Sequence, residues 1–122
     1  MISSFPREPG FGGKTDYVFF FVGALTTEQN HLIPRIVKAD AMTVNKLQVY
    51  LESAPTGDDA EFEFYVDDVS IGAVTVLDGE TSGSLDLDPV EEIAANSVVT
   101  MEINQVGSEY QGRTATGIVR IA

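Results

Sequence analysis

The stretch over residues 46–80 limits the possible folds most, because it holds three alternations of apolar and polar residues separated by two turns. Side chains of an extended strand point to opposite faces with a period of two. Apolar residues at every second position of 47–51 and 62–66 therefore predict two strands, each with one buried face. Asp67-Asp68 then predicts a tight hairpin turn into a third strand over 70–77.

The rest of the sequence continues this strand pattern. One short helix is expected over 88–96, with Asp88 as N-cap and Pro89 at the first helical position. Pro34 lacks an N–H group and marks its strand as an edge strand or a bulge. Further strands are predicted over residues 17–25, 31–38, 84–88, 97–106 and 113–122. About eight strands with frequent turns are typical of an all-β protein, a single antiparallel β-sandwich or jelly roll, here over residues 17–122.

The segment before this domain, residues 1–16, is predicted to be an extended N-terminal arm. It contains two Pro and three Gly, which disfavour a helix or a central strand. Phe5 and Phe11 are its informative residues, since burying each ring on a neighbour would contribute roughly 1.5–3 kcal/mol. Three alternatives stay open: the arm docks on another subunit, it folds back onto its own sandwich, or it is disordered.

Residues 17–25 form the most apolar run, and three consecutive Phe residues place rings on both faces of the expected strand. One face can join the domain's own core. The other face carries either Phe19 and Phe21 or Val18 and Phe20, and it needs a second layer or a partner, because a bare apolar face promotes aggregation. The run therefore favours an oligomer.

Charge is unevenly distributed along the chain, whose net charge is -12. Residues 47–112 contain fifteen Asp and Glu and no Lys or Arg, whereas the segments before and after are slightly basic. Such an acidic body repels phosphate backbones, so nucleic-acid binding is not expected. The acidic residues can simply form a solvated surface; alternatively, the acidic body faces water while the near-neutral N-terminal third meets a partner.

Several other classes of function are disfavoured. The absence of Cys excludes disulfides and thiolate chemistry. No apolar run is long enough to span a membrane, and none resembles a signal peptide, so synthesis and assembly in a cytoplasm are expected.

No catalytic residue, metal site or cofactor is expected. His31 is the only His and is interpreted as a surface residue. Glu61 and Glu63 share a strand face, as the paired carboxylates of a glycosidase could, but an outward acidic face is usually only solvated. Three acidic pairs could in principle bind Ca²⁺, yet none has the spacing of a calcium loop: Asp58-Asp59, Asp67-Asp68 and Asp86 with Asp88.

Particular segments resemble the β-sandwich modules of tailed-bacteriophage structural proteins, over about residues 17–122. They are the strand end at Gly23-Ala24-Leu25, Ile33-Pro34-Arg35, the strand Met42 to Tyr50, the turn Ala54-Pro55-Thr56-Gly57 with the strands that follow to Gly72, and Met101 to Ser108. The sequence departs from that pattern at Asp67-Asp68, where such modules have an Asn-Gly-like turn, and over 88–96, where they have a short loop.

This resemblance implies a virion component, and a lone module with a short aromatic arm suits a capsid decoration (cement) protein. Its implied partners are the major capsid protein and sister subunits, with a trimer favoured, and its implied location is the capsid surface after assembly in the host cytoplasm. The residues expected to contact capsid or sister subunits are Phe5, Arg7, Phe11, Lys14, Phe19 and Phe21.

Two alternatives remain. One is a tail or baseplate module that binds a host surface glycan through Tyr50, Tyr65 and Tyr110. The other is a small hydrolase with a site built between subunits.

Overall fold

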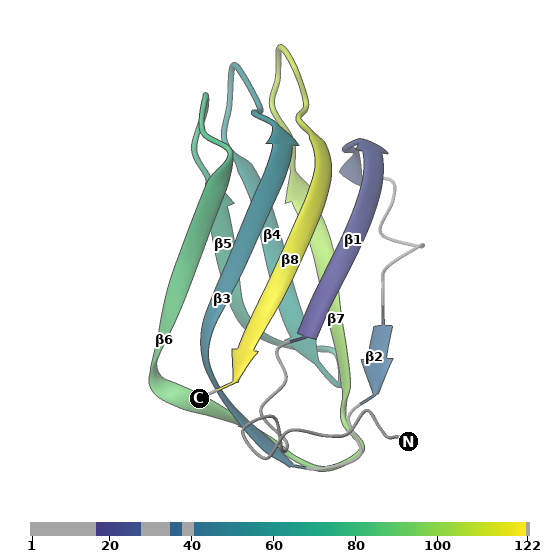
Figure 1. Cartoon of the computed structure of the whole chain (residues 1–122), viewed down its shortest axis with the longest axis vertical. Coiled ribbons are helices and arrows are strands. Elements are labelled where there is room, and N and C mark those ends of the chain that lie inside the picture. Colours follow the sequence, from purple (N-terminus) through teal and green to yellow (C-terminus); the bar gives the residue numbers. More distant parts are fainter. Residues whose placement is uncertain (1–16, 28–34, 38–40, 122) are drawn as a thin grey trace, which may run out of the picture.

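The computed structural model describes residues 17–27, 35–37 and 41–121. Within these ranges the chain forms eight strands arranged as two four-stranded sheets that face each other (Figure 1). The strands are β1 (Tyr17–Ala24), β2 (Arg35–Val37), β3 (Met42–Ser53), β4 (Ala60–Val66), β5 (Val69–Val76), β6 (Ser82–Ile93), β7 (Val98–Gln105) and β8 (Arg113–Ile121). The first sheet has the order β1-β8-β3-β6 and the second the order β2-β7-β4-β5. The predicted all-β sandwich is confirmed.

The pairing of the strands is that of a jelly roll. Each strand of the first half pairs antiparallel with one of the second half: β1 with β8, β2 with β7, β3 with β6 and β4 with β5. This is the pattern of one long hairpin, its tip at the β4–β5 turn, that has been rolled up. The additional pairs β3–β8 and β4–β7 join the rolled hairpin into two sheets.

The core lies between the two sheets and is filled by the inward positions of the predicted alternations. Leu47, Val49 and Leu51 of β3 face Phe62 and Phe64 of β4, and all five side chains are buried. From the other strands come Phe19, Val44, Val74, Val76, Ile93, Val99, Met101, Ile103, Ala115 and Val119. The alternations predicted for β3, β4, β7 and β8 are therefore confirmed.

Gly117 of β8 allows this core to close tightly. It pairs with Phe19 of β1 on one side and with Val49 of β3 on the other. A Cβ atom at this position would collide with the Sδ atom of Met101 and would lie 3.3 Å from Cζ of Phe64. Phe19 and Phe64 meet edge to face across the same region, with ring centroids 6.1 Å apart.

The predicted two-residue turn between β4 and β5 is confirmed. Asp67 and Asp68 have φ values of 50° and 68°, the left-handed conformation that tight hairpin turns require and that Asp adopts more readily than most residues. The Asp67 carboxylate accepts a hydrogen bond of 2.9 Å from the N–H of Val98. The backbone N–H of Asp67 donates one of 2.8 Å to the carbonyl of Val98. The turn is thereby joined to the start of β7.

The helix predicted over 88–96 is wrong. The chain there continues as β6, which runs without interruption from Ser82 to Ile93 and absorbs the short strand predicted over 84–88. β6 pairs along β3, and its C-terminal part lies opposite Met42, Thr43 and Val44. Because β6 is the edge strand of its sheet, Pro89 can sit in it without an N–H group, joined to Asp88 by a cis peptide bond.

The strand predicted over 31–38 is described only as β2, and it lies at an edge of the second sheet, as Pro34 suggested. The arm over 1–16, His31 and Pro34 lie outside the described residues. Within the described part of the chain, no helix is long and apolar enough to cross a membrane.

Candidate interaction surface

The acidic pairs considered as calcium ligands lie at three separate places. Asp59 accepts a hydrogen bond of 2.8 Å from the backbone N–H of Asp78. Asp67 is bonded to the first residue of β7, and Asp86 forms an ion pair of 3.4 Å with Lys46. Among the described residues, no group of three His, Cys, Asp or Glu side chains could hold a metal ion.

Glu63, the carboxylate considered for glycosidase chemistry, belongs to a hydrogen-bonded group on the outer face of the second sheet. The hydroxyl of Tyr65 lies 3.1 Å from Oε1 of Glu63 and 3.3 Å from Oε1 of Glu102. Nδ2 of Asn104 donates a hydrogen bond of 2.7 Å to the same oxygen of Glu63. The group links β4 to β7 through side chains.

The electrostatics of this group favour a structural role. Hydrogen bonds from Ser70, Asn104 and Tyr65 lower the pKa of Glu63, although partial burial opposes them. Burial, together with the bonds to the two carboxylates and their charges, raises the pKa of Tyr65 to about 12. A general acid or base works best with a pKa near the working pH. The pKa values of both groups are shifted away from neutral pH, so the carboxylate stays ionised and the phenol stays protonated.

The outer face of the first sheet carries an uncharged patch that crosses all four strands. Strand register places its eight residues in two neighbouring rows, Val18-Ile118-Gln48-Ser84 and Phe20-Thr116-Tyr50-Ser82. Phe20 is 60% exposed, Tyr50 44% and Val18 41%. Exposed apolar groups gathered on one face indicate an interaction site more strongly than scattered ones.

Charged residues border this patch at both ends of its strands. Lys46 lies in the next row, opposite Arg120 of β8 and Asp86 of β6. Nε of Arg120 donates a hydrogen bond to Oε1 of Gln48. At the other end, Arg113 and Glu52 form an ion pair of 3.5 Å. An uncharged centre with a charged rim is the usual anatomy of a protein–protein interface.

The two outer faces of the sandwich differ in charge. The three Lys and Arg side chains that the structure describes, Lys46, Arg113 and Arg120, all belong to strands of the first sheet. The carboxylates of Asp86 and Glu52 on the first sheet are each paired with one of these cations. The outer face of the second sheet carries the carboxylates of Glu61, Glu63 and Glu102 on β4 and β7, with no Lys or Arg side chain among those described. The molecule therefore has one face suited to contact and one suited to water.

The structure separates the residues predicted to contact a partner. Phe5, Arg7, Phe11 and Lys14 lie outside the described residues. Phe19 is only 1% exposed and belongs to the core, so the expectation that it contacts a partner is corrected. The backbone of Phe21 pairs with Ala115, and its side chain is outside the description. The exposed face of β1 is instead the other alternative, Val18 and Phe20.

Sequence reasoning missed the remainder of the patch. The outward position of Tyr50 followed from its alternation, but Ile118 and Thr116 join it only through the β3–β8 pairing. The orientation of β1 also depends on pairing, because three consecutive Phe residues give no signal of which one turns inward. Phe19 turns inward with its pairing partner Gly117, where the missing Cβ leaves room for Met101 and Phe64 in the core.

The three tyrosines proposed for a glycan site are not brought together. Tyr50 lies on the outer face of the first sheet and Tyr65 on that of the second. Tyr110 lies in the loop between β7 and β8, where it pairs as an isolated bridge with Thr56. A sugar needs several such groups around one position, and this arrangement does not favour a glycan site built from them.

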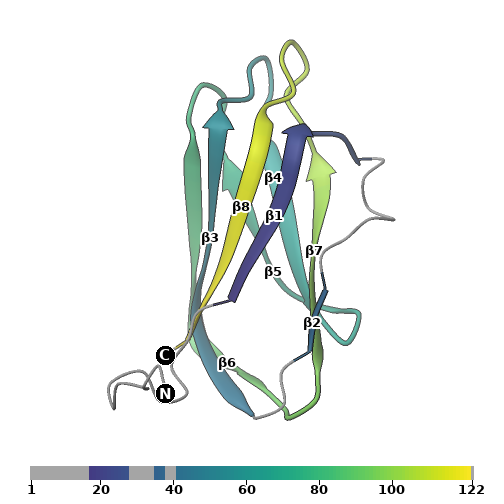
Figure 2. The same ribbon diagram turned by 45° about the vertical axis from the view of Figure 1, so that its right-hand side comes forward.

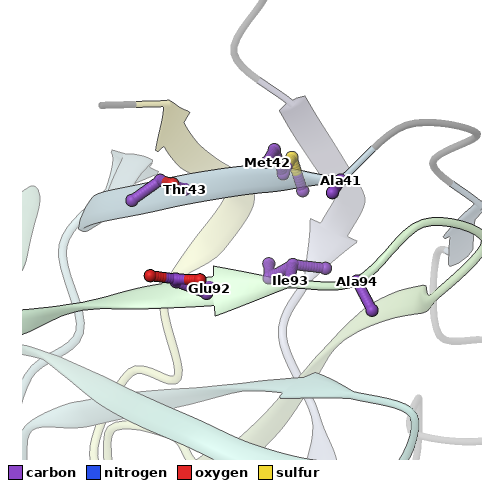
Figure 3. A pocket seen from close by; sticks show the side chains of 6 residues that line it. All are labelled: Ala41, Met42, Thr43, Glu92, Ile93 and Ala94. Carbon is purple, nitrogen blue, oxygen red and sulfur yellow. The ribbon is translucent and has the colours of Figure 1, made fainter.

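A pocket of about 300 Å³ lies where the start of β3 meets the end of β6 (Figure 3). Its lining is mostly apolar, with Met42 and Ile93 side by side and Glu92 as the ionisable side chain among the lining residues. Convergent polar groups, which mark most ligand sites, are not present in this lining. The uncharged patch is therefore the stronger candidate.

No protein-family model matches the chain, and no curated protein matches it. Similar solved structures include the core of Drosophila NLP, studied for pentamer formation and histone binding, with 16% identity, a TM-score of 0.46, and coverage of 88% of this chain and 98% of that one. The catalytic unit of a GH87 α-1,3-glucanase from Streptomyces thermodiastaticus has 15% identity and a TM-score of 0.44, over 88% of this chain and 24% of that one. GITRL from bushbaby has 15% identity and a TM-score of 0.36, over 69% of this chain and 74% of that one. No functional inference is taken from likenesses of this degree.

Proposed function

We propose that this chain is a non-enzymatic structural protein that decorates the outer surface of a capsid, where it binds the major capsid protein and stabilises contacts between capsid subunits. The observation that carries the proposal is the asymmetry of the sandwich, with the uncharged patch on one outer face and carboxylates on the other. The sequence resemblance to phage structural modules supplies the kind of partner.

The asymmetry suits a protein that coats a large assembly. Burying the exposed side chains of Val18 and Phe20 would contribute roughly 1.5–3 kcal/mol each, and the uncharged patch loses little hydration when it is covered. The acidic second sheet stays in water, and the net charge of -12 disfavours non-specific association. Repeated contacts on a symmetric capsid would then add through avidity.

The arm is part of the same proposal. Phe5, Arg7, Phe11 and Lys14 add two aromatic rings and two positive charges to a chain that is otherwise strongly acidic. The basic groups would pair with individual carboxylates of the capsid protein, and the rings would add buried area.

The test is cosedimentation of the purified protein with capsids that lack it. We expect the protein to saturate the capsids at a fixed stoichiometry, and deletion of residues 1–16 or the substitution Phe20→Lys to abolish binding. The matched control is Val69→Lys, which adds the same charge at a position on the second sheet that is 67% exposed. Unchanged binding by both altered proteins would remove the arm and the patch from the proposal.

A protein that ignores capsids would overturn the decoration role itself. Specific binding to host cells or on a glycan array would then favour a tail or baseplate module.

A further inference from the structure

β1 is an edge strand whose outer backbone groups pair with no other strand that the structure describes. It lies at the end of the first sheet and, among the described residues, pairs only with β8 (Figures 1 and 2). The N–H and C=O groups along a strand edge are a template for another strand. Natural proteins usually block such a template with charged residues, Pro, a bulge or a short edge. The eight residues of β1, YVFFFVGA, contain no charged residue and no Pro. The register shift of β1 lies near its end, between Phe21 and Ala24, and the pairing with β8 is regular from Tyr17 to Phe21.

The other edges that the structure describes carry these protective features. β6 includes Asp86, Asp88, Pro89, Glu91 and Glu92. β5 also lacks charged residues and Pro, but it contains a register shift opposite Phe64 and Tyr65, and it lies against β6 so closely that a Cβ atom on Gly83 would collide with the carbonyl oxygen of Thr75. β2 is three residues long. β1 is therefore the described edge best suited to accept a further strand.

We propose that β1 pairs antiparallel with β1 of a second copy, so that the first sheets of two molecules join into one continuous eight-stranded sheet. A strand edge presents the same groups to itself when two copies meet around a two-fold axis, so the contact is self-complementary. With the axis near Phe19, Phe20 of each copy lies beside Val18 of the other. Aromatic and β-branched side chains in such cross-strand pairs stabilise a sheet.

Charge favours contact between two copies through β1 over contact through the acidic parts of the molecule. Two molecules with a net charge of -12 repel each other, and residues 47–112 hold fifteen of the acidic groups. β1 and the two rows of the patch beside it are uncharged. Pairing through β1 brings the uncharged regions of both copies together and leaves the acidic second sheets on the outside.

The N-terminal arm is a poorer occupant of this edge. Pro6 and Pro9 remove two ladder N–H groups, and three Gly residues weaken strand pairing. Pairing of two equivalent edges closes at two copies, so the inference replaces the trimer that the resemblance implies. It is independent of the capsid role: a protein that pairs but ignores capsids would keep the edge contact and lose only the decoration function.

The first test is the mass of the protein in solution by light scattering. We expect two chains for the unaltered protein and one chain for Phe20→Lys, because the axis places the two introduced charges close together. Phe20 is 60% exposed, and circular dichroism would verify that the variant keeps its fold. Val69→Lys, on the second sheet, should remain at two chains.

The second test locates the interface without altering β1. The chain has no Cys, so single spin labels can be placed through Tyr50→Cys on β3 or Ser82→Cys on β6, which lie in one row. In the joined sheet the two β3 strands are five strand spacings apart and the two β6 strands seven, which gives separations of about 24 Å and about 34 Å. The second label should therefore report a distance about 10 Å longer than the first.

Several results would overturn the inference. These are a mass of one chain or three for the unaltered protein, a Phe20→Lys variant that still contains two chains, and label distances that do not increase from β3 to β6. Two chains, loss of pairing in Phe20→Lys alone and the expected increase in distance would support it.

Discussion

At the scale of single residues, the group around Tyr65 shows how one hydrogen-bonded cluster can hold two ionisable side chains in opposite states. The pKa of Glu63 is lowered chiefly by hydrogen bonds from Ser70 and Asn104. The pKa of Tyr65 is raised chiefly by burial. The folded state therefore favours a charged carboxylate and a neutral phenol. In these states the two side chains form the hydrogen bonds that join β4 to β7.

Tyr65 gives a prediction for alkaline pH. Its pKa is about 12 in the folded state and about 10 in the unfolded state, so the unfolded chain ionises first. The stability it contributes is fully present below about pH 10 and is lost as the pH rises through about 12. Tyr65→Phe should cost about 1 kcal/mol at neutral pH, and its deficit relative to the unaltered protein should shrink above about pH 10. Urea unfolding of both proteins at several pH values measures this.

A second variant tests the cause of the shift. Glu102→Gln removes one of the charges that raise the pKa of Tyr65, so the tyrosinate absorbance of the folded protein should appear at lower pH. If the free energy of unfolding changed with pH in the same way in the unaltered protein and in Tyr65→Phe, the raised pKa of Tyr65 would be contradicted.

At the scale of elements, the β4–β5 turn forms where the sequence predicts it, but its two Asp residues are less suited to the turn conformation than Gly would be. Both Asp residues adopt positive φ, a conformation that costs residues with a Cβ roughly 1–2 kcal/mol and Gly far less. Among the described residues, Asp67 alone of the two offsets this cost with a side-chain hydrogen bond, which it accepts from the N–H of Val98.

The two turn positions should therefore respond differently to glycine. Asp68→Gly should raise the free energy of unfolding by about 0.5–1 kcal/mol, because it relieves the backbone at a residue with no side-chain bond among those described. Asp67→Gly should gain less or lose stability, because a hydrogen bond worth about 1 kcal/mol disappears. Denaturant unfolding of the two variants compares them directly, and equal effects would show that the bond to Val98 contributes nothing.

The elements also show what the sequence could predict. Strands with strict alternation, such as β3, β4 and β7, can be predicted because burial of one face makes every second residue apolar. Only the first half of β6 was predicted as a strand, because Asp88, Pro89, Glu91 and Glu92 in its second half form a good local helix start. The segment becomes a strand because its backbone pairs with the twelve-residue β3, and this pairing cannot be seen in the local sequence.

The candidate site was only partly predictable for a similar reason. The apolar run at β1 indicated a face in need of a cover, but the side facing out depends on the pairing of β1 with β8, in which Phe19 lies opposite Gly117, almost a hundred positions away. The patch exists only once β1, β8, β3 and β6 stand side by side. The patch depends on pairing between strands that are distant in sequence, and such pairing produces no pattern of apolar residues within any one segment.

At the scale of the whole molecule, the jelly roll accommodates a large excess of negative charge by spreading it over the outside of two sheets. The three described basic side chains all lie on the first sheet, and two of them form ion pairs with neighbouring acids. The acidic groups of the second sheet are bound mainly by hydrogen bonds from neutral partners. Repulsion among carboxylates is thus the main electrostatic term opposing the compact state.

Salt should therefore stabilise this protein. Raising the ionic strength from about 0.01 M to about 0.5 M shortens the screening length from about 30 Å to well under 10 Å, which weakens repulsion between distant carboxylates while buried contacts persist. We expect the melting temperature to rise by several degrees, equivalent to about 1 kcal/mol. Salt also weakens repulsion between copies, so the rise should be measured in Phe20→Lys as well, in which pairing through β1 is expected to be lost. A rise that persists there is due to the fold itself, whereas one confined to the unaltered protein is due to association. A melting temperature that falls with salt would mean that the ion pairs of the first sheet stabilise the fold more than the repulsion among carboxylates destabilises it. The proposed difference in charge between the two faces would then have little effect on stability.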